Sequence, residues 1–253
     1  MSTREARGRW ASRAVQALFL VSLIALWAIA TSWGQINKIL LPAPLPVFYE
    51  LVDVIKTGEY IGDLAVTLTE LAAAFMISAV AGTMVGFLVS RSPYAIKVFE
   101  PLMASAYSVP LILFLPLYIL FFGLGEPSKI ALGATISFFP VALNTIAGFG
   151  NIERIFTVSA RSMGASNYQL FRYVLLPAAL PVILTGLRMG FTVALLAILG
   201  SETIASLAGI GHRIAMLSES MDMAHMFAYI AFAIAIAAFL NAVVSSLEAR
   251  GRR

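Results

Sequence analysis

Cysteine is absent from this 253-residue chain, and charged residues are sparse. Without cysteine there is no disulfide, no thiolate nucleophile and no thiolate-bound metal. Charged residues make up 12% of the chain, about half the share that is usual in soluble domains, whereas hydrophobic residues make up 60%. This balance indicates a membrane protein that crosses the bilayer several times, rather than one large soluble domain.

Six apolar runs are long enough to cross a bilayer as helices, and they predict an all-α polytopic membrane protein with six transmembrane helices. The runs cover residues 14–33, 64–90, 99–122, 130–150, 180–204 and 225–247. The first follows a basic head, as in a signal peptide, but it is too long for such a peptide and no small-x-small cleavage site follows it, so a retained span is expected. Residues 46–63 mix charged and apolar residues and predict a surface helix outside the membrane.

The distribution of Lys and Arg predicts the orientation of these spans. If the N-terminus is cytoplasmic, the inner segments hold twelve Lys and Arg residues and the outer segments hold four. Basic residues accumulate on the cytoplasmic side, so both termini are expected there. The net charge of +4 is explained by anionic lipid of the inner leaflet, and no nucleic-acid partner is needed.

The stretch between the fourth and fifth spans predicts two short helices separated by a glycine. Asn151 is a candidate N-cap, and Gly164 suits the positive-φ position that ends a helix. Ser166 followed by Gln169 forms a capping-box pattern, and Pro177 is expected to close the second helix. The segment fits either an interfacial helix that anchors the chain to lipid headgroups or a docking surface that passes motion between a soluble partner and the spans.

The same 151–177 segment resembles the cytoplasmic signature loop of permease subunits in binding-protein-dependent ABC importers. That pattern runs E-A-A, three residues, G, nine residues, I-x-L-P, and this chain gives V-S-A, R-S-M, Gly164, A-S-N-Y-Q-L-F-R-Y and V-L-L-P. Val158 and Ser159 replace the glutamate and the first alanine. The resemblance implies a coupling helix that sits in a cleft of an ATP-hydrolysing subunit. The ATPase-coupling residues that it implies are Ala160, Gly164, Ala165, Ser166, Leu176 and Pro177.

Further stretches, among them "PLYILFFGLGEPSKI", "LPAALPVILTGLRMGF" and "SLAGIGHRI", resemble the nitrate, sulfonate and taurine branch of these permeases. The resemblance implies a type I importer fold, with a five-helix core at residues 63–253 behind an N-terminal part at residues 1–62. It also implies a homodimer in the bacterial inner membrane, with two cytoplasmic ATP-binding subunits and an extracytoplasmic solute-binding protein. The expected cargo is a small anionic solute such as nitrate, a sulfonate or taurine.

The chain lacks the motifs that would make it an enzyme. It has no G-x-x-x-x-G-K-[ST] phosphate loop, so ATP and Mg²⁺ are expected on a separate ATPase subunit and this chain needs no cofactor of its own. Its two histidines have no acidic neighbours at metal-ligand spacing, which argues against a metal site. The alternative function is a secondary carrier driven by an ion gradient, which predicts inverted repeats, and no such repeat is visible.

Prolines inside the third and fourth spans predict kinked helices beside a cavity. The candidate lining of a translocation path is Ser105, Ser108, Asn144, Thr145, Arg188, Thr192 and Glu202. Arg188 fits an attraction for an anionic substrate, but it also fits contact with headgroups or pairing with a neighbouring helix. Glu202 fits a place on the path or at an outer gate, and equally a carboxylate bonded between helices.

Overall fold

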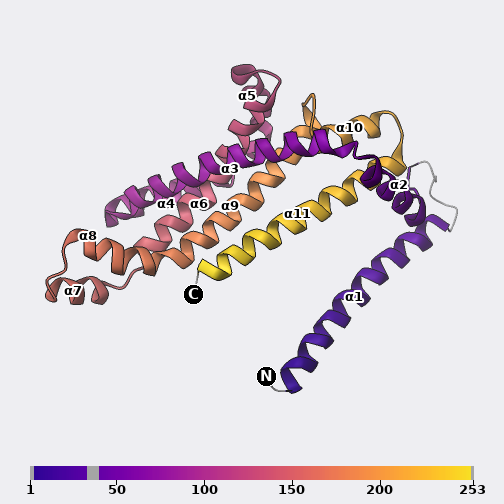
Figure 1. Cartoon of the computed structure of the whole chain (residues 1–253). Coiled ribbons are helices and arrows are strands. Elements are labelled where there is room, and N and C mark those ends of the chain that lie inside the picture. Colours follow the sequence, from indigo (N-terminus) through magenta and orange to yellow (C-terminus); the bar gives the residue numbers. More distant parts are fainter. Residues whose placement is uncertain (1–2, 33–39, 252–253) are drawn as a thin grey trace. The chain divides into compact units, whose positions relative to one another are not determined.

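The computed structural model describes residues 3–32 and 40–251, and these contain helices and no strand (Figure 1). In chain order they are α1 (Thr3–Ser32), α2 (Pro44–Thr57), α3 (Tyr60–Ser90), α4 (Pro93–Tyr107), the 3₁₀ turn η1 (Leu111–Phe114), α5 (Leu115–Phe122), α6 (Glu126–Gly150), α7 (Arg154–Ser162), α8 (Asn167–Leu170), the π-turn η2 (Phe171–Leu175), α9 (Leu176–Ile204), α10 (Ile210–Glu219) and α11 (Met223–Gly251).

The chain divides into two compact units. One combines Met1–Tyr60 with Ile214–Phe232, and the other combines Ile61–Arg213 with Ala233–Arg253. In the first unit α2 ends at Thr57 because Gly58 takes a φ of 72° and donates its N–H to the Val54 carbonyl at 3.2 Å. The surface helix predicted at residues 46–63 is therefore too long at its C-terminal end, and Asp63 belongs to α3.

Four helices in the described part of the chain are long and apolar enough to cross a membrane. They are α3, α6, the continuous helix Asn167–Ile204 and Met223–Ser246 of α11; α4 and the Leu111–Phe122 helix make a fifth span if their pair, bent by 74°, is counted as one. In α1 the apolar part Val21–Ser32 is shorter than a span, and residue 33, the predicted end of the first span, lies outside the described residues. The all-helical fold is confirmed, and the count of six spans stays a prediction.

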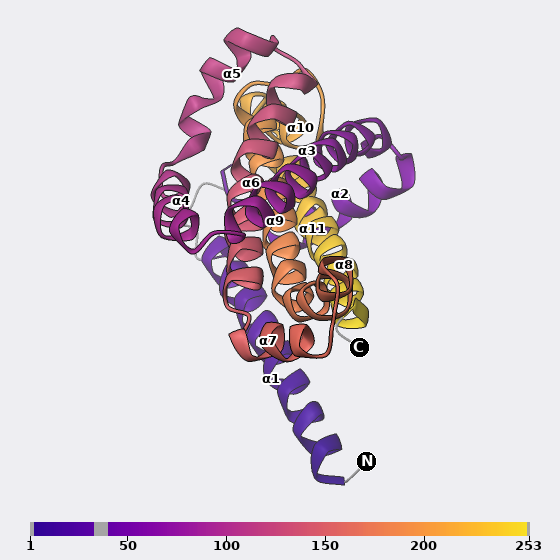
Figure 2. The ribbon, with the colours of Figure 1, turned by 90° about the vertical axis from the view of Figure 1, so that its left-hand side faces the viewer.

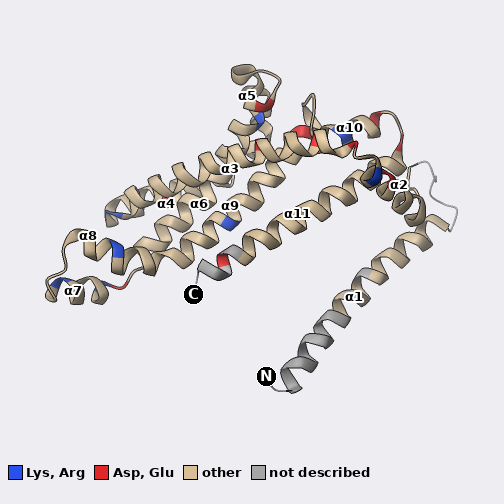
Figure 3. Ribbon diagram, in the orientation of Figure 1, with Lys and Arg blue, Asp and Glu red and all other residues tan. Residues whose placement is uncertain are grey.

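The predicted kink of the third span is present. The helix stops at Tyr107, and Pro110 precedes the 3₁₀ turn that leads into α5. Proline lacks the N–H that would continue the helix, so the chain turns there. Most charged residues of the described chain lie near helix ends and in turns, with a basic position in the interior of α9 as an exception (Figure 3).

Glycines hold α3, α6 and α9 close together in the second unit. A Cβ added at Gly82 would lie 2.8 Å from the Val141 Cβ, and one at Gly86 would lie 2.6 Å from the Thr145 Cβ, so α3 and α6 run in parallel. On α9, Gly186 faces Asn144 and Gly190 faces Val141. The residue numbers rise along α9 while they fall along α6, so the two helices are antiparallel. Helix backbones can approach this closely only where a small residue stands. Figure 2 shows α6 and α9 side by side, with α7 and α8 at one end.

Gly86→Ala is expected to lower the free energy of unfolding by about 1–3 kcal/mol, because the added methyl group overlaps Thr145 and the carbonyl of Ala142. The matched control is Gly62→Ala in the same helix, where nothing lies within 4 Å of an added Cβ. Thermal unfolding of both variants in one detergent measures the difference. Equal melting temperatures would show that α3 and α6 are not in close contact.

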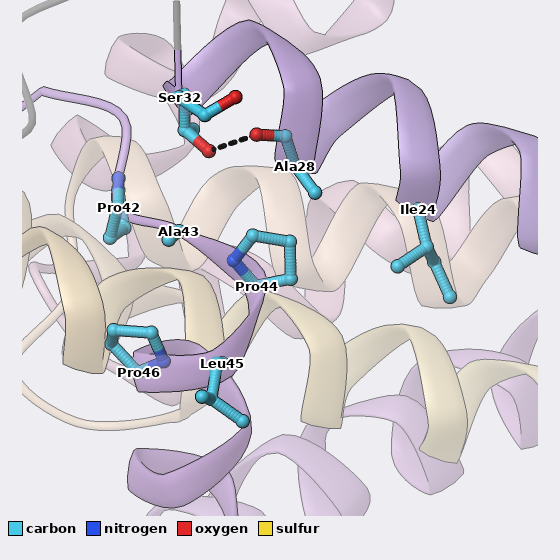
Figure 4. A pocket seen from close by; sticks show the side chains of 9 residues that line it. Ile24, Ala28, Ser32, Pro42, Ala43, Pro44, Leu45 and Pro46 are labelled. Carbon is cyan, nitrogen blue, oxygen red and sulfur yellow. Dashed lines mark hydrogen bonds between the residues drawn. The ribbon is translucent and has the colours of Figure 1, made fainter. Parts of the chain in front are cut away.

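In the first unit, a groove lies between α1 and the start of α2 (Figure 4). Ile24, Ala28, Thr31, Ser32 and residues 42–46 line it. The Thr31 hydroxyl donates to the Ala28 carbonyl of its own helix at 2.9 Å. The lining offers hydroxyl groups but no charge, so this groove suits an apolar chain better than a small anion.

Candidate functional site

The turn after α7 is built around Gly164. Its φ is 82°, in the left-handed region that favours glycine. The Gly164 N–H donates to the Arg161 carbonyl at 2.9 Å, and the Ala165 N–H donates to the Ala160 carbonyl at 3.0 Å. These two bonds form a Schellman motif, which satisfies the last carbonyls of the helix. The predicted helix stop at Gly164 is confirmed.

Two residues later the chain enters α8 through a capping box. The Ser166 Oγ accepts from the Gln169 N–H at 3.3 Å, and the Gln169 Oε1 accepts from the Ser166 N–H at 2.9 Å. The Arg161 guanidinium adds bonds to the Ala165 carbonyl and to the Asn167 side chain. The predicted capping box is confirmed, and the turn between α7 and α8 is held by its own hydrogen bonds.

Two predictions about helix ends in the 151–177 segment are wrong, the N-cap at Asn151 and the closure of a helix at Pro177. Asn151 is the C-cap of α6, donating its N–H to the Ala147 carbonyl at 3.1 Å, and α7 begins after Glu153. Pro177 does not close a helix, because it stands in the first turn of α9. The chain widens into the π-turn η2 just before it, where the Leu176 N–H bonds to the Phe171 carbonyl. A π-turn accommodates a proline, which has no N–H and whose ring clashes with the preceding turn.

As a result α8, η2 and α9 form one helix, Asn167–Ile204. A displacement of the turn at Gly164 is therefore a displacement of the end of this helix. Local hydrogen bonds fix one side of the turn and the long helix fixes the other. Of the predicted coupling residues, Leu176 and Pro177 begin α9, Ala160 lies in α7, and Gly164, Ala165 and Ser166 lie in the turn between α7 and α8.

The outer surface of the turn is hollowed and apolar. A hollow of about 490 Å³ is lined by Phe156, Ser159, Ala160, Met163, Gly164, Ala165, Gln169, Tyr173 and Val174. Met163 is 86% exposed, and Tyr168 and Tyr173 are each 71% exposed. Arg154, Arg161 and Arg172 belong to the same segment, which Figure 3 shows as blue marks on and beside α7 and α8. Large apolar side chains exposed beside charges are typical of a protein-binding surface.

The opposite end of α9 carries a buried polar cluster around Glu202. The Thr67 hydroxyl donates to Glu202 Oε1 at 2.7 Å, and the Gly211 N–H donates to Glu202 Oε2 at 2.7 Å. Gly209 has a φ of 108°, and a Cβ there would lie 2.3 Å from Glu202 Oε1. The loop "SLAGIGHRI" thus packs around the Glu202 carboxylate. This agrees with the interpretation of Glu202 as a carboxylate bonded between helices.

Sequence reasoning missed a second part of this cluster. The Lys129 Nζ lies 2.9 Å from Glu70 Oε1 and donates to the Ser206 Oγ at 2.8 Å. The two charged side chains are 2% and 0% exposed. One signal was available, because Asp63, Thr67 and Glu70 recur on one face of an otherwise apolar helix.

The predicted path residues are distributed over α4, α6 and α9. The side chains of Ser105, Ser108, Asn144, Thr145 and Thr192 each donate to a carbonyl of the preceding turn of their own helix. Thr145 and Glu202 are buried, whereas Ser105 and Ser108 are exposed. Their role in transport stays a prediction.

Arg188 pairs with a neighbouring helix. Its Nη1 lies 3.4 Å from Glu248 Oε2, and the Thr185 hydroxyl donates to Glu248 Oε1 at 3.2 Å. Two positions one turn apart on α9 therefore hold one carboxylate of α11. The Arg188 side chain is 41% exposed, so the pairing with Glu248 covers it only in part.

Comparison with known sequences identifies relatives that match most of the chain. It is 33% identical over 226 residues to the taurine transport system permease protein of Escherichia coli (strain K12), covering 87% of this chain and 82% of that protein. It is 30% identical over 226 residues to the putative aliphatic sulfonates transport permease protein of Bacillus subtilis (strain 168), covering 89% and 82%.

Solved structures share the fold. A methionine ABC transporter in inward-facing conformations matches with a TM-score of 0.64 at 18% identity, over 82% of this chain and 99% of that chain. An amino acid ABC transporter with histidines matches with a TM-score of 0.63 at 24% identity, over 80% and 97%. The family model of the binding-protein-dependent transport system inner membrane component matches residues 78–252. The chain therefore belongs to the family of inner membrane components of binding-protein-dependent transport systems.

Proposed function

We propose that this chain forms the path of a small anionic solute through the inner membrane, and that its 151–177 segment couples this movement to ATP hydrolysis on a separate subunit. The family makes the chain a multi-pass inner-membrane permease of an ABC importer. The names of its relatives, which refer to taurine and aliphatic sulfonates, favour a sulfonate-like cargo; nitrate is a further candidate. Both family and fold favour an importer over a secondary carrier.

The observation that carries the coupling role is the construction of the turn at Gly164. The turn is held by internal hydrogen bonds, exposes apolar side chains and continues into the helix Asn167–Ile204. A partner that binds this surface and moves would displace the end of a membrane helix directly. A lipid-anchoring helix would need neither the stiff turn nor the continuous helix.

The assembly that we propose has two copies of this chain, two cytoplasmic ATP-binding subunits and an extracytoplasmic solute-binding protein. ATP and Mg²⁺ would bind to the ATP-binding subunits, and no catalytic role is proposed for this chain. With six spans both termini would lie on the same side of the membrane, and the excess of Lys and Arg in the inner segments favours the cytoplasm. Residues 63–253 form the five-helix core in this proposal, and residues 1–62 contribute the first span and the surface helix.

Cysteine crosslinking from Met163 tests the proposed docking surface. Met163→Cys introduces the single thiol of the chain at a residue that is 86% exposed, and it leaves the Ser166 cap intact. A thiol-reactive photo-crosslinker in native membranes is expected to capture an ATP-binding protein, identified by mass spectrometry, with a yield that changes on adding ATP and Mg²⁺.

Leu120→Cys on α5 is the matched control. This residue is 78% exposed but lies on a helix remote in sequence from the 151–177 segment, and it is expected to give lipid adducts. Adducts with lipid or with a second copy alone at Met163→Cys would contradict the coupling role and would return the segment to a membrane anchor.

A further inference from the structure

Three aromatic rings from three elements meet where the 151–177 segment joins the membrane helices. Phe87 of α3 lies 5.1 Å from Phe149 of α6 and 5.4 Å from Phe171 of η2, measured between ring centroids. Phe149 and Phe171 are 6.3 Å apart and nearly parallel. We call Phe87, Phe149 and Phe171 the aromatic triad. Its distances and its edge-to-face angles of 64° and 66° are those of stabilising ring pairs.

Phe171 is distinguished from the other aromatic residues of the segment by its contacts. Tyr168 and Tyr173 are each 71% exposed, and Phe156 is exposed as well. Phe171 is partly buried and is the first residue of the π-turn. Its carbonyl accepts the N–H of Leu176, so Phe171 belongs to the π-turn that precedes Pro177.

The triad therefore adds a contact through side chains to the covalent connections of the 151–177 segment. The chain itself leads into α6 at Asn151 and into α9 at Leu176. The triad contact runs from Phe171 to α6 and to α3, and α3 has no covalent connection to the segment. All of these connections belong to the same compact unit.

The triad also borders open space. An apolar groove of about 500 Å³ between α3, α6, η2 and α9 is lined by Ala79, Val80, Thr83, Met84, the three triad residues, Leu176, Ile183 and Leu187. Rings that are closely packed on every side cannot change their contacts without strain. Here the groove gives the rings room to tilt while they stay in contact.

We propose that Phe171 is a positioning residue for coupling, whose ring passes displacement of the 151–177 segment to α3 and α6 as well as to α9. This inference rests on the proposed coupling function. It predicts that removing the ring separates movement of the turn from movement of α3, while docking of the ATP-binding subunit persists.

Two reporters on the cysteine-free chain test this separation. Met163→Cys reports on the turn, and Ile77→Cys, 53% exposed on α3, reports on the core. Each is labelled with the environment-sensitive fluorophore bimane, in the complex purified from native membranes. Adding ATP with orthovanadate is expected to change the fluorescence at both positions.

Phe171→Ala is expected to leave the response at Met163→Cys intact and to reduce the response at Ile77→Cys about 5-fold or more, the lower end of coupling between sites. Phe171→Tyr keeps the ring and is expected to retain both responses. Phe122→Ala is the matched control, because it removes a ring that stacks on Tyr118 of the same helix, away from the triad, and it is expected to leave both responses unchanged.

The outcomes are distinguishable. An undiminished response at Ile77→Cys in Phe171→Ala would overturn the role of the triad and leave the proposed function standing. Loss of both responses would also overturn it, because the ring would then seat the turn rather than pass on its movement. Absence of a response at Met163→Cys with Phe171 present would contradict the proposed function itself.

Discussion

Lys129→Met is expected to lower the free energy of unfolding by roughly 3–5 kcal/mol, the cost of removing one partner from a buried ion pair. The Lys129 ammonium and the Glu70 carboxylate are 2.9 Å apart and almost wholly buried. Methionine has a similar length but no charge, so the buried Glu70 carboxyl group would lose its cationic partner, and Ser206 would lose its donor. Unfolding of the purified protein in mixed micelles, followed by circular dichroism, measures the change.

A double variant separates the charge from the packing. Replacing both members of a buried pair with apolar residues of similar volume is often neutral, so adding Glu70→Leu to Lys129→Met is expected to restore most of the lost stability. The restored part measures the interaction between the two sites. If the double variant is as unstable as Lys129→Met alone, the lysine acts through its bond to Ser206 and not through Glu70.

Gly164→Val is expected to reduce solute uptake per ATP hydrolysed by roughly 5- to 150-fold, the range that couplings of 1–3 kcal/mol produce. Nothing lies within 4 Å of a Cβ at this position, so the penalty comes from the backbone φ of 82° alone. A β-branched residue escapes the strain by rotating the peptide. The Schellman bonds would then break, and the Ser166 cap would shift. Uptake and ATP hydrolysis in proteoliposomes, together with the amount of protein in the membrane, report the effect.

The chain offers a matched control at Gly123. Its φ is 84°, and nothing lies within 4 Å of an added Cβ there either, but it stands in the turn between α5 and α6. With a φ of 84° and a ψ of 169°, Gly123 also has a backbone conformation that excludes a β-branched residue, so Gly123→Val is expected to introduce backbone strain of its own and to leave the ratio of uptake to hydrolysis unchanged. Gly164→Asn is expected to restore coupling, since asparagine tolerates the left-handed region. Full coupling in Gly164→Val would exclude the glycine turn as the transmitting element.

Local hydrogen bonding explains which parts of the 151–177 segment could be predicted. Gly164, Ser166 and Gln169 act on neighbours within a few residues, so their roles could be inferred from spacing. The role of Pro177 could not be inferred from spacing. The π-turn before it changes which carbonyl lies opposite the proline ring, so the helix continues through the proline. Asn151 was equally ambiguous, since the same residue type suits the end of one helix and the start of the next.

The buried cluster shows a different limit. Glu202 is a candidate from the sequence, whereas Lys129 counts there only as one of the four basic residues of the outer segments, and its partner Glu70 is far away in the chain. Which charges meet depends on how α3, α6 and α9 pack, and the glycines that set this packing do not specify which helix they face. The family resemblance supplied the fold, whereas the ion pair emerged only from the structure.

The self-contained construction of the turn at Gly164 has a consequence for how this transporter can diversify. The atoms that hold the turn are mainly backbone groups, with the side chains of Ser166, Gln169 and Arg161. The most exposed large hydrophobic side chains of the segment belong to other residues, Met163, Tyr168 and Tyr173. On the proposed coupling role, a descendant of this chain could therefore change these three side chains, and with them its ATP-binding partner, without having to refold the turn.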